Sequence, residues 1–285
     1  MPALANVNGE VMLLSEVRIS ALDRGFLFGD AVYEVLRVYA GKPWLLEQHQ
    51  RRLASSLAAI RIEGVDLDRL KRRMLDTIAV GLFREAQVYI QITRGAAPTR
   101  SHAFPQDAKP LELLFVEEFE DRYAEQRLHG AAAITYPDPR WARCDIKSTN
   151  LLGNVLAAQA AKEAGVAEAL LYQPDGRILE GSRTSLFGVL DGQLRTAPCQ
   201  PNILPGITRE LILNLARDLS LLVREEALVR DDLPRVSEMF ITGTSSEVLP
   251  IIKVDQKLIG SGQPGPKTWS LMAAYRTAVE NFKRS

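Results

Sequence analysis

Hydrophobic and polar residues follow two different periods along this chain, and the changes of period mark the expected strands and helices. Near the start, Asn8-Gly9 separates two short apolar segments, 5–7 and 11–13, which is the pattern of a β-hairpin with a two-residue turn. Residues 31–39 alternate as a strand does, and residues 47–60 place their apolar side chains on one helical stripe.

Further elements follow from the same reasoning. Asp66 is a good N-cap for a helix whose apolar residues recur at helical spacing, and Gly165 suits the C-terminal end of a later helix. The remaining strands are expected at 88–93, 111–116, 131–136, 168–172, 184–190 and 238–242, and the remaining helices at 150–164, 208–218 and 267–282. Strands and helices are mixed without strict alternation, which favours an α+β fold over a doubly wound parallel sheet.

Length and charge suggest where the chain divides. A chain of 285 residues is long enough for two compact domains. The densest charge between two apolar segments lies in the run 117–126. We therefore expect an N-terminal α+β domain at 1–120, a linker at 121–129 and a C-terminal domain at 130–285.

Composition argues against several classes of protein. Lysine plus arginine equals aspartate plus glutamate at 35 each, so charge does not point to nucleic acid or to an acidic membrane. No window approaches the roughly 20 apolar residues of a membrane span, and residues 1–6 lack the features of a signal peptide. Cys144 and Cys199 are expected to stay free thiols, and no metal site is expected. These observations predict a soluble, cytoplasmic protein.

One lysine stands at a junction that suits covalent chemistry. Lys147 follows an apparent strand and an irregular run, and it lies just before a small-residue helix that begins near Asn150. Burial and neighbouring positive charge lower the pKa of an amine and leave it nucleophilic, so a lysine held here could form an imine. An isolated lysine before a helix is more often an exposed surface residue, so the interpretation depends on the rest of the chain.

Three other clusters carry possible chemistry, each with an ordinary structural alternative. The segment 23–34 places two glycines beside aromatic residues and puts Tyr33 on a strand, which also fits an aromatic core. Glu180-Gly181-Ser182 can hold a proton on a heteroaromatic nitrogen, or it can simply form a turn. Gly206-Ile207-Thr208 opens a helix, where N–H groups can bind an anion or where Thr208 can act as the N-cap.

Two loops complete the set of candidates. The hydroxyl-rich loop 242–246 could share one phosphate with the helix that starts near residue 207, and Arg52 could add charge. Arg100 and His102 project from a loop rich in Gly and Pro that follows a strand. A guanidinium suits bidentate carboxylate recognition, and the alternative is a solvated loop.

Taken in chain order, these clusters closely resemble the motifs of the fold-type IV pyridoxal-phosphate transaminases, and within them the D-amino acid transaminases. The resemblance runs from Asn8-Gly9 to beyond Pro250. Its motifs are Arg24-Gly-x-x-Phe-Gly-Asp-x-Val-Tyr-Glu, Arg143-Cys-Asp-Ile-Lys-Ser-x-Asn-Leu-Leu-Gly, Glu180-Gly-Ser and Gly206-Ile-Thr-Arg. The family implies a smaller N-terminal α/β sandwich and a larger C-terminal pseudo-barrel that binds the cofactor.

The resemblance also implies roles for single residues. Lys147 would form the internal aldimine with pyridoxal 5'-phosphate and later shuttle the proton between substrate Cα and cofactor C4′. Glu180 would pair with the pyridine nitrogen. The other cofactor-binding residues, including the phosphate cup, would be Arg52, Leu204, Ile207, Thr208, Gly243 and Thr244.

The substrate class follows from another part of the resemblance. Tyr33, Arg100 and His102 match the trap for the substrate α-carboxylate in D-amino acid transaminases. Because the lysine acts from one fixed face, a carboxylate held at this trap presents the Cα–H of a D-amino acid to it. The family delivers the Arg-x-His loop from the neighbouring subunit, which implies an obligate homodimer with a shared active site.

The expected function is a ping-pong transfer of the amino group between D-amino acids, such as D-alanine and D-glutamate, and 2-oxo acids. Two related activities stay open: a branched-chain L-amino acid transaminase, which is not expected to carry Arg-x-His, and a 4-amino-4-deoxychorismate lyase. A non-catalytic cofactor-binding module is disfavoured by the intact Lys147 and Glu180. The chain departs from the family at three positions, where its members carry Ser, Asn and Ser: Arg183, Ser185 and Gly243. These departures bear on phosphate affinity and side-chain preference, whereas the implied reaction type does not depend on them.

Overall fold

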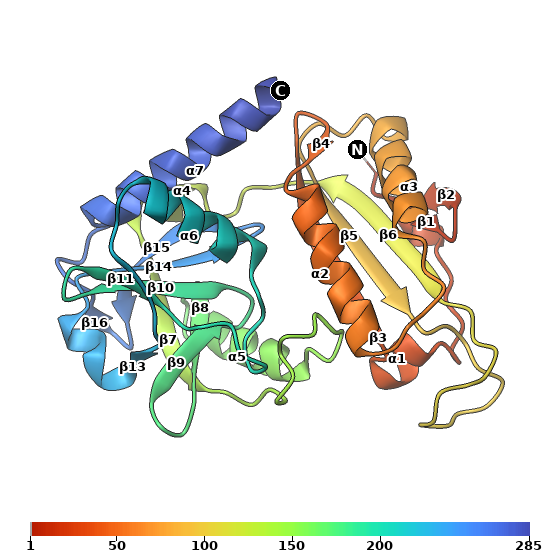
Figure 1. The fold of residues 1–285 in the computed structure, drawn as a ribbon, viewed down its shortest axis with the longest axis horizontal. Helices are drawn as coiled ribbons and strands as arrows, with labels where there is room; N and C mark the ends of the chain where they lie inside the picture. Colours follow the sequence, from red (N-terminus) through yellow and green to blue (C-terminus); the bar gives the residue numbers. More distant parts are fainter. Residues whose placement is uncertain (1) are drawn as a thin grey trace. The chain divides into compact units, whose positions relative to one another are not determined.

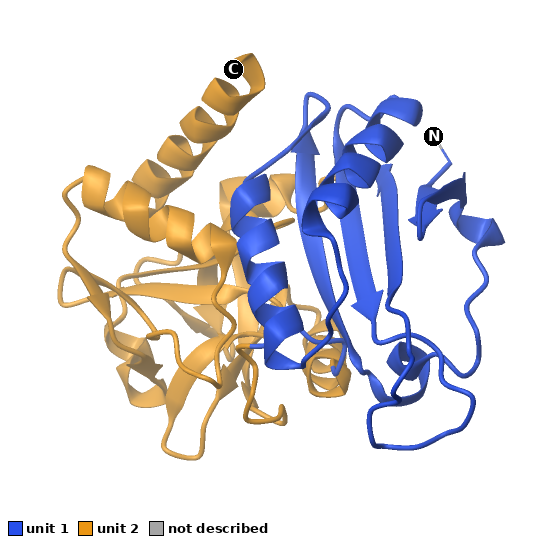
Figure 2. Ribbon diagram, turned by 45° about the vertical axis from the view of Figure 1, so that its right-hand side comes forward, with its two compact units in different colours: residues 1–120, 146–150 blue, residues 121–145, 151–285 orange. Residues whose placement is uncertain are grey.

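The computed structural model describes residues 2–285, which divide into two compact units (Figure 2). Unit 1 contains the residues up to Glu120 together with 146–150, and unit 2 contains 121–145 and 151–285. The segment 121–129, expected as a linker, is packed within unit 2. Its Arg127 is buried, pairs with Asp121 and donates to the Ser246 carbonyl at 3.2 Å.

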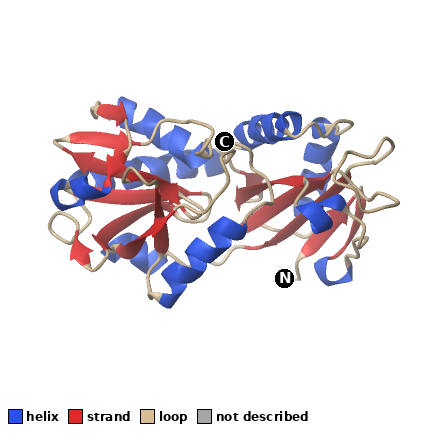
Figure 3. Cartoon of the chain, turned by 90° about the horizontal axis from the view of Figure 1, so that it is seen from below, coloured by secondary structure: helices blue, strands red, loops and turns tan. Residues whose placement is uncertain are grey.

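Unit 1 is a six-stranded antiparallel sheet in the order β2-β1-β6-β5-β3-β4. Its strands are β1 Leu4–Val7, β2 Glu10–Leu13, β3 Ala31–Tyr39, β4 Lys42–Pro43, β5 Ala86–Thr93 and β6 Leu111–Glu118. Its helices are η1 Leu14–Glu16, α1 Arg24–Phe28, α2 Leu46–Ala59 and α3 Leu67–Val80. Helices α2 and α3 lie along one face of the sheet (Figures 1 and 3) and enclose the core between helix and strand.

Local sequence explains these elements. In the first hairpin Asn8 and Gly9 take φ of 53° and 108°, the left-handed values that a two-residue hairpin turn requires, so that predicted hairpin is confirmed. The Asp66 side chain accepts the Arg69 N–H at 2.9 Å and caps α3 as predicted. Strand β3 has the predicted bounds because its alternating apolar residues include the buried Val32 and Leu36.

Unit 2 is a ten-stranded mixed sheet that closes on itself. Its strands are β7 Ala131–Pro137, β8 Glu168–Tyr172, β9 Arg177–Gly181, β10 Ser185–Leu190, β11 Gln193–Thr196, β12 Val223–Glu225, β13 Leu228–Val229, β14 Glu238–Gly243, β15 Glu247–Val254 and β16 Lys257–Leu258. Its helices are α4 Ala124–His129, α5 Leu152–Glu163, α6 Ile207–Asp218, η2 Arg230–Arg235 and α7 Pro266–Arg284. Strand β9 pairs with both β8 and β10, which joins β10, β14, β15, β7, β8 and β9 into a ring.

These observations confirm the predicted α+β fold with a smaller N-terminal unit and a larger barrel-like one. Gly165 follows α5 with φ of 66°, as expected at the end of a helix. Across residues 2–285, no helix has both the length and the apolar character needed to cross a bilayer.

Candidate active site

Lys147 is carried by a five-residue segment, 146–150, that belongs to unit 1 although the chain on either side of it belongs to unit 2. The segment runs beside the start of β3, where the Tyr33 N–H donates to the Lys147 carbonyl at 2.9 Å. Ile146 is buried in the core of unit 1, and the Lys147 N–H donates to Ser56 Oγ on α2 at 3.2 Å. The backbone of the lysine is thereby held by a strand and by a helix.

A buried carboxylate lies in the same strand. Glu34 is 1% exposed and accepts hydrogen bonds from Arg52 Nε at 2.7 Å, Arg52 Nη2 at 2.8 Å and His49 Nδ1 at 2.7 Å. Both partners come from α2, three residues apart, so they present their side chains from one face of the helix. Arg52, predicted to bind phosphate, is thus held in place by a bidentate ion pair.

Charge in this group is balanced. Burial raises the pKa of Glu34, but Arg52 and His49 lower it more strongly, and it falls from its ordinary 4.5 to about 2. Burial lowers the pKa of His49 against the opposing effect of Glu34, and the cations of Arg52 and Lys147 lower it further. A neutral His49 carries its proton on Nδ1 when it donates to Glu34. At neutral pH one carboxylate therefore faces one guanidinium and a neutral imidazole.

Tyr33, predicted to bind substrate, lies against the predicted catalytic lysine. Lys147 Nζ is 4.1 Å from the centroid of the Tyr33 ring. The Tyr33 ring also stacks on that of Tyr89, with 5.8 Å between ring centroids. Burial, assisted by Tyr33, raises the pKa of Tyr89 to about 12. The structure therefore brings Tyr33, Lys147 and the Glu34 group together within unit 1.

Arg100 and His102, the other two predicted substrate residues, lie in the loop between β5 and β6. The His102 ring packs edge-on against Phe28, with 5.2 Å between centroids. The guanidinium carbon of Arg100 lies 5.0 Å from the centroid of the same ring. Phe28 is the last residue of α1, so this short helix supports both side chains.

Three strands of unit 2 align near their ends at one side of the barrel. Ser185, at the start of β10, pairs with Glu180 in β9 and with Thr242 in β14. Gly206, just before α6, packs closely on this edge, because a Cβ built on it would lie 2.6 Å from Ser185 Oγ. A side chain at position 206 would therefore force the Ser185 hydroxyl to move.

Glu180 shares a guanidinium with a second carboxylate. Arg140 Nη1 donates to Glu180 Oε1 at 2.5 Å, while Arg140 Nε and Nη2 donate to Asp138 at 2.9 Å each. The N–H of Leu204, a predicted cofactor residue, also donates to Glu180 Oε1, at 3.3 Å. The three charged side chains are each about 5% exposed.

The charge in this second group is unbalanced, since two carboxylates surround one guanidinium. Burial raises the pKa of Glu180 above its ordinary value, with Asp138 adding to the rise and Arg140 opposing it. Arg140 itself has a raised pKa, because its two carboxylate partners outweigh the effect of burial. A further cation beside Glu180 would restore the balance.

Helix α6 begins two residues earlier than it would if Thr208 were its N-cap. The N-cap is Gly206, in an extended conformation with φ of −68° and ψ of 127°, and Ile207 and Thr208 are the first two helical residues. The alternative in which Thr208 is the N-cap is therefore excluded. No side chain of residues 2–285 caps this end, so the first N–H groups can bind an anion.

The loop after β14 has spare hydrogen-bonding capacity. Gly243 ends the strand and Thr244 follows it in the turn to β15. Within the described part of the chain, Thr242 Oγ1 and Ser246 Oγ are buried and make no hydrogen bond. A Cβ built on Gly243 would lie 3.0 Å from Ser246 Oγ. Buried hydroxyls are normally hydrogen-bonded, so these two hydroxyls can still bond to an additional polar group.

The other residues that the sequence analysis singled out make contacts within the fold. Arg183 is exposed and donates to the Tyr123 hydroxyl at 2.7 Å. Ser185 is buried at the barrel edge described above. Cys144 is buried, donates its Sγ–H to the Trp141 carbonyl at 3.2 Å, and has its pKa raised to about 11, chiefly by burial. Such a thiol is a packing group rather than a nucleophile.

Sequence reasoning assigned no role to Arg140, Asp138, Glu34 or His49. For Glu34 a signal existed, because it shares the inward side of β3 with Val32 and Leu36, and a charged residue at such a position needs a buried partner. For Arg140 the only local signal is Asp138 two residues earlier, in a segment without a helical or strand period.

Comparison with known proteins gives a consistent result. The family model described as amino-transferase class IV matches residues 31–254. The D-alanine aminotransferase of Bacillus licheniformis is 38% identical over 276 residues, which cover 95% of each chain.

Solved structures point to the same fold. The branched-chain amino acid aminotransferase of Escherichia coli has a TM-score of 0.90 at 26% identity, covering 97% of this chain and 94% of that one. A T.th. branched-chain amino acid aminotransferase solved with pyridoxamine 5'-phosphate has a TM-score of 0.89 at 26% identity, covering 99% and 95%. The predicted fold type IV is thereby confirmed, and the chain belongs to the class IV aminotransferases.

Proposed function

We propose that this chain is a pyridoxal-phosphate-dependent aminotransferase that transfers the amino group between D-amino acids, such as D-alanine and D-glutamate, and 2-oxo acids. One observation carries the proposal most directly: buried Glu180 shares the cation of Arg140 with Asp138. One negative charge of this group is left uncompensated, and a protonated pyridine nitrogen is a cation suited to balance it. The name of the relative from Bacillus licheniformis supports D-amino acids as substrates.

The residues of unit 2 fit this cofactor. Among the described residues the buried hydroxyls of Thr242 and Ser246 lack partners, and the uncapped start of α6 offers N–H groups to an anion. Gly243 lacks the hydroxyl that family members carry there, but Ser246 Oγ lies close to where that side chain would begin. We propose that Ser246 supplies the missing hydroxyl.

Seven residues are proposed to hold the cofactor in addition to Lys147. Glu180 takes the ring nitrogen, and the others take the phosphate and the ring: Arg52, Leu204, Ile207, Thr208, Gly243 and Thr244. When bound, the cofactor supplies an electron sink for the bonds at substrate Cα.

Lys147 is the proposed catalytic residue. Its backbone is held by Tyr33 and Ser56, and its Nζ lies 4.1 Å from the centroid of the Tyr33 ring. Held in this way, the Lys147 amine would take the proton from substrate Cα and return it on the same face, two bonds from where it was removed, so that one group would serve as both base and acid. Two half-reactions then use one site in turn, which gives ping-pong kinetics.

Reduction with borohydride tests the role of the lysine. Reduction should fix the cofactor to the Lys147 peptide, as read by peptide mass spectrometry, and Lys147→Ala should abolish both the label and the turnover. A label on another lysine, or full activity of Lys147→Ala, contradicts the assignment.

Tyr33, Arg100 and His102 are proposed to bind the substrate α-carboxylate and so to select the hand of the substrate. Arg100 provides a guanidinium for bidentate recognition, and the Tyr33 ring already contacts Lys147. In this proposal the chain acts as a homodimer in which the Arg100–His102 loop of one subunit serves the lysine of the other.

Mixing of subunits tests the shared site. When Lys147→Ala and Arg100→Ala proteins are unfolded together and refolded, a mixed dimer with a shared site has one intact site, and activity should return. If each site is built from one subunit, both sites of the mixed dimer carry a defect, and activity at a D-alanine concentration below the KM stays at the low level of the Arg100→Ala protein. The molar mass of the wild type in solution checks the dimer independently.

A second candidate is transamination of branched-chain L-amino acids, which the names of the two solved structures support. The decisive experiment is a half-reaction screen with D-alanine, D-glutamate, L-alanine, L-leucine and aminodeoxychorismate. Cofactor absorbance reports transamination, and release of pyruvate from aminodeoxychorismate reports lyase action. A faster response to L-leucine than to D-alanine would replace the proposed function by this second one.

A further inference from the structure

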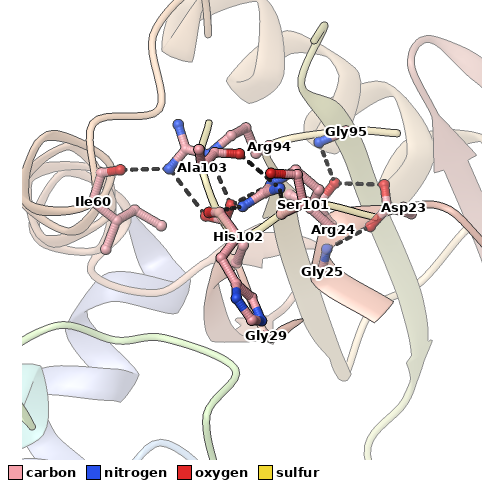
Figure 4. Close-up of polar contacts among 12 residues, drawn as sticks. Asp23, Arg24, Gly25, Gly29, Ile60, Arg94, Gly95, Ser101, His102 and Ala103 are labelled. Atoms are coloured by element: carbon pink, nitrogen blue, oxygen red, sulfur yellow. Dashed lines mark hydrogen bonds and ion pairs between the residues drawn. The ribbon is translucent and has the colours of Figure 1, made fainter. Parts of the chain in front are cut away.

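The loop that carries Arg100 and His102 is held by a buried arginine that the proposed function does not use. Arg24, the first residue of α1, is 3% exposed. Its Nη1 donates to the carbonyls of Ser101 at 2.5 Å and Ala103 at 3.2 Å, and its Nη2 donates to the carbonyl of His102 at 3.0 Å. One guanidinium therefore binds three consecutive peptide carbonyls of the loop (Figure 4).

Asp30 fixes the orientation of this guanidinium. Arg24 Nε donates to Asp30 Oδ2 at 2.8 Å, and Arg94 donates to both oxygens of the same carboxylate, at 2.8 and 3.0 Å. Arg94 also donates to the carbonyls of Ile60 and Arg61, at the end of α2. Two cations and one anion leave a surplus positive charge, which the five carbonyl dipoles stabilise.

Regular secondary structure does not support the loop, and its other contacts are made by side chains: the guanidinium carbons of Arg94 and Arg61 lie 3.6 and 4.9 Å from the centroid of the Phe104 ring. Residues 98–110 contain no helix or strand, and residues 100–104 are exposed. At its base Gly95, with φ of 94°, is so close to the other end of the loop that a Cβ would lie 1.9 Å from the Lys109 carbonyl. The base is closed by backbone packing, whereas the tip at 101–103 is fixed by Arg24.

The side chains of the tip rest on the same helix. Phe28 packs against the His102 ring and the Arg100 guanidinium, and the Arg24 guanidinium carbon lies 4.9 Å from its centroid. The motif Arg24-Gly-x-x-Phe28-Gly-Asp30 thus supplies a clamp for the loop backbone, a support for its side chains and the anion that orients the clamp.

From this arrangement we propose that Arg24 is a positioning residue for carboxylate recognition: it holds residues 101–103 so that Arg100 and His102 are presented as a pair, while touching neither substrate nor cofactor. The inference rests on the proposed role of these two residues. A guanidinium is required, because its planar fork reaches three carbonyls, whereas a lysine ammonium offers one point of charge.

Three variants of the cofactor-loaded enzyme test this role: Arg24→Met, Arg24→Lys and, as a matched control, Arg37→Lys. Arg37 is a buried arginine of unit 1 with an ion pair to Glu85. Both Arg24 variants should raise the KM for D-alanine between about tenfold and a hundredfold, the range expected for misplaced binding groups, with kcat changed less than about threefold. The control should leave the KM unchanged.

Hydrogen exchange provides a readout that does not depend on activity. Peptides covering 98–108 should exchange faster in both Arg24 variants than in the wild type, while peptides of β3 and β5 keep their protection. Unchanged exchange of the loop in Arg24→Met, an unchanged KM, or full rescue by Arg24→Lys would each overturn the proposal. If Arg24→Met does not fold, Phe28→Leu replaces it, and it should raise the KM without touching a buried charge.

The two proposals fail in different ways. If the wild type does not convert D-alanine, the proposed function fails, while the exchange measurement still decides whether Arg24 orders the loop. If the wild type converts D-alanine and the Arg24 variants keep its KM, only the positioning role is lost.

Discussion

The two units each bury a glutamate next to an arginine, yet they shift the pKa of that glutamate in opposite directions. In unit 1, Glu34 faces Arg52 and a neutral His49, and its pKa falls to about 2. In unit 2, Glu180 shares Arg140 with Asp138, and its pKa is raised. Burial opposes ionisation in both groups, so the number of charges around each carboxylate decides the outcome.

This difference separates a carboxylate whose charge is balanced by its own neighbours from the one that we propose to pair with the cofactor. The Glu34 group is neutral overall and complete, and it fixes Arg52 and the helix that supports the lysine segment. The Glu180 group has one more carboxylate than cations. This buried charge lowers the free energy of unfolding, and a bound cation would offset the loss. We infer that the charge balance of a buried ion pair indicates which one is built for a ligand.

The largest effect is expected from removing the cation of the unbalanced group. Arg140→Met leaves Glu180 and Asp138 buried without that counter-charge and should lower the free energy of unfolding by about 3–5 kcal/mol. Urea denaturation at pH 7 measures the loss. Arg143→Met is the control, because the exposed Arg143 pairs with its near neighbour Asp145 at the surface, and it should unfold at the wild-type midpoint.

Glu34→Gln should cost about 3 kcal/mol near neutral pH, the equivalent of lowering a carboxyl pKa from 4.5 to about 2. Because the folded pKa is below the unfolded one, the stabilisation is complete above pH 4.5 and is lost as the pH falls towards 2. The difference between variant and wild type should therefore be constant from pH 7 to 5 and shrink below pH 4.5. A difference that grows on acidification would contradict the charge balance assigned to unit 1.

Glu180→Gln should have a smaller effect on the cofactor-free protein, below about 1 kcal/mol, because it leaves a balanced Arg140–Asp138 pair. The raised pKa means that ionisation of Glu180 destabilises the fold as the pH rises above 4.5. The free energy of unfolding of Glu180→Gln, relative to the wild type, should therefore rise with increasing pH. That of Glu34→Gln should fall. Equal losses in the two variants would remove the distinction between the groups.

The smallest effect is expected for the reactivity of Cys144, because the charges of the Glu180 group shift the pKa of its thiol. Burial raises its pKa to about 11, with Arg140 lowering it and Glu180 and Asp138 raising it. In a Cys199→Ser background, alkylation of Cys144 at pH 8 should be slow and should become faster in Glu180→Gln, because a neighbouring negative charge is lost. An unchanged rate of Cys144 alkylation in Glu180→Gln would show that Glu180 does not carry the negative charge that acts on the thiol.

Much of the fold follows from local sequence. The hairpin at Asn8-Gly9, strand β3 and the Asp66 cap depend on neighbouring residues, and the structure has them as predicted. Strand β15 was not predicted from the sequence. Pro250 lies inside it, and proline is rare in a central strand. Its pairing with β14 and β7 is determined by the closed barrel rather than by its own residues.

The candidate site is less accessible to sequence reasoning. The motifs locate Lys147, Glu180 and the start of α6, but the return of residues 146–150 to unit 1 has no local signal, since five residues carry no period. Arg140 is equally hidden, because its importance arises from a partner 40 residues away. Contacts of this kind become visible only when the chain is folded.

The closed base at Gly95 and Lys109 has an evolutionary consequence. Since the two ends of the intervening stretch already touch, it can be lengthened, shortened or exchanged among relatives without disturbing β5 or β6, and doubling its length would cost only about 0.6 kcal/mol in closure entropy. The stretch that carries the proposed carboxylate-binding residues Arg100 and His102 can thereby be replaced as a unit, while Lys147 and the residues that hold it stay unchanged.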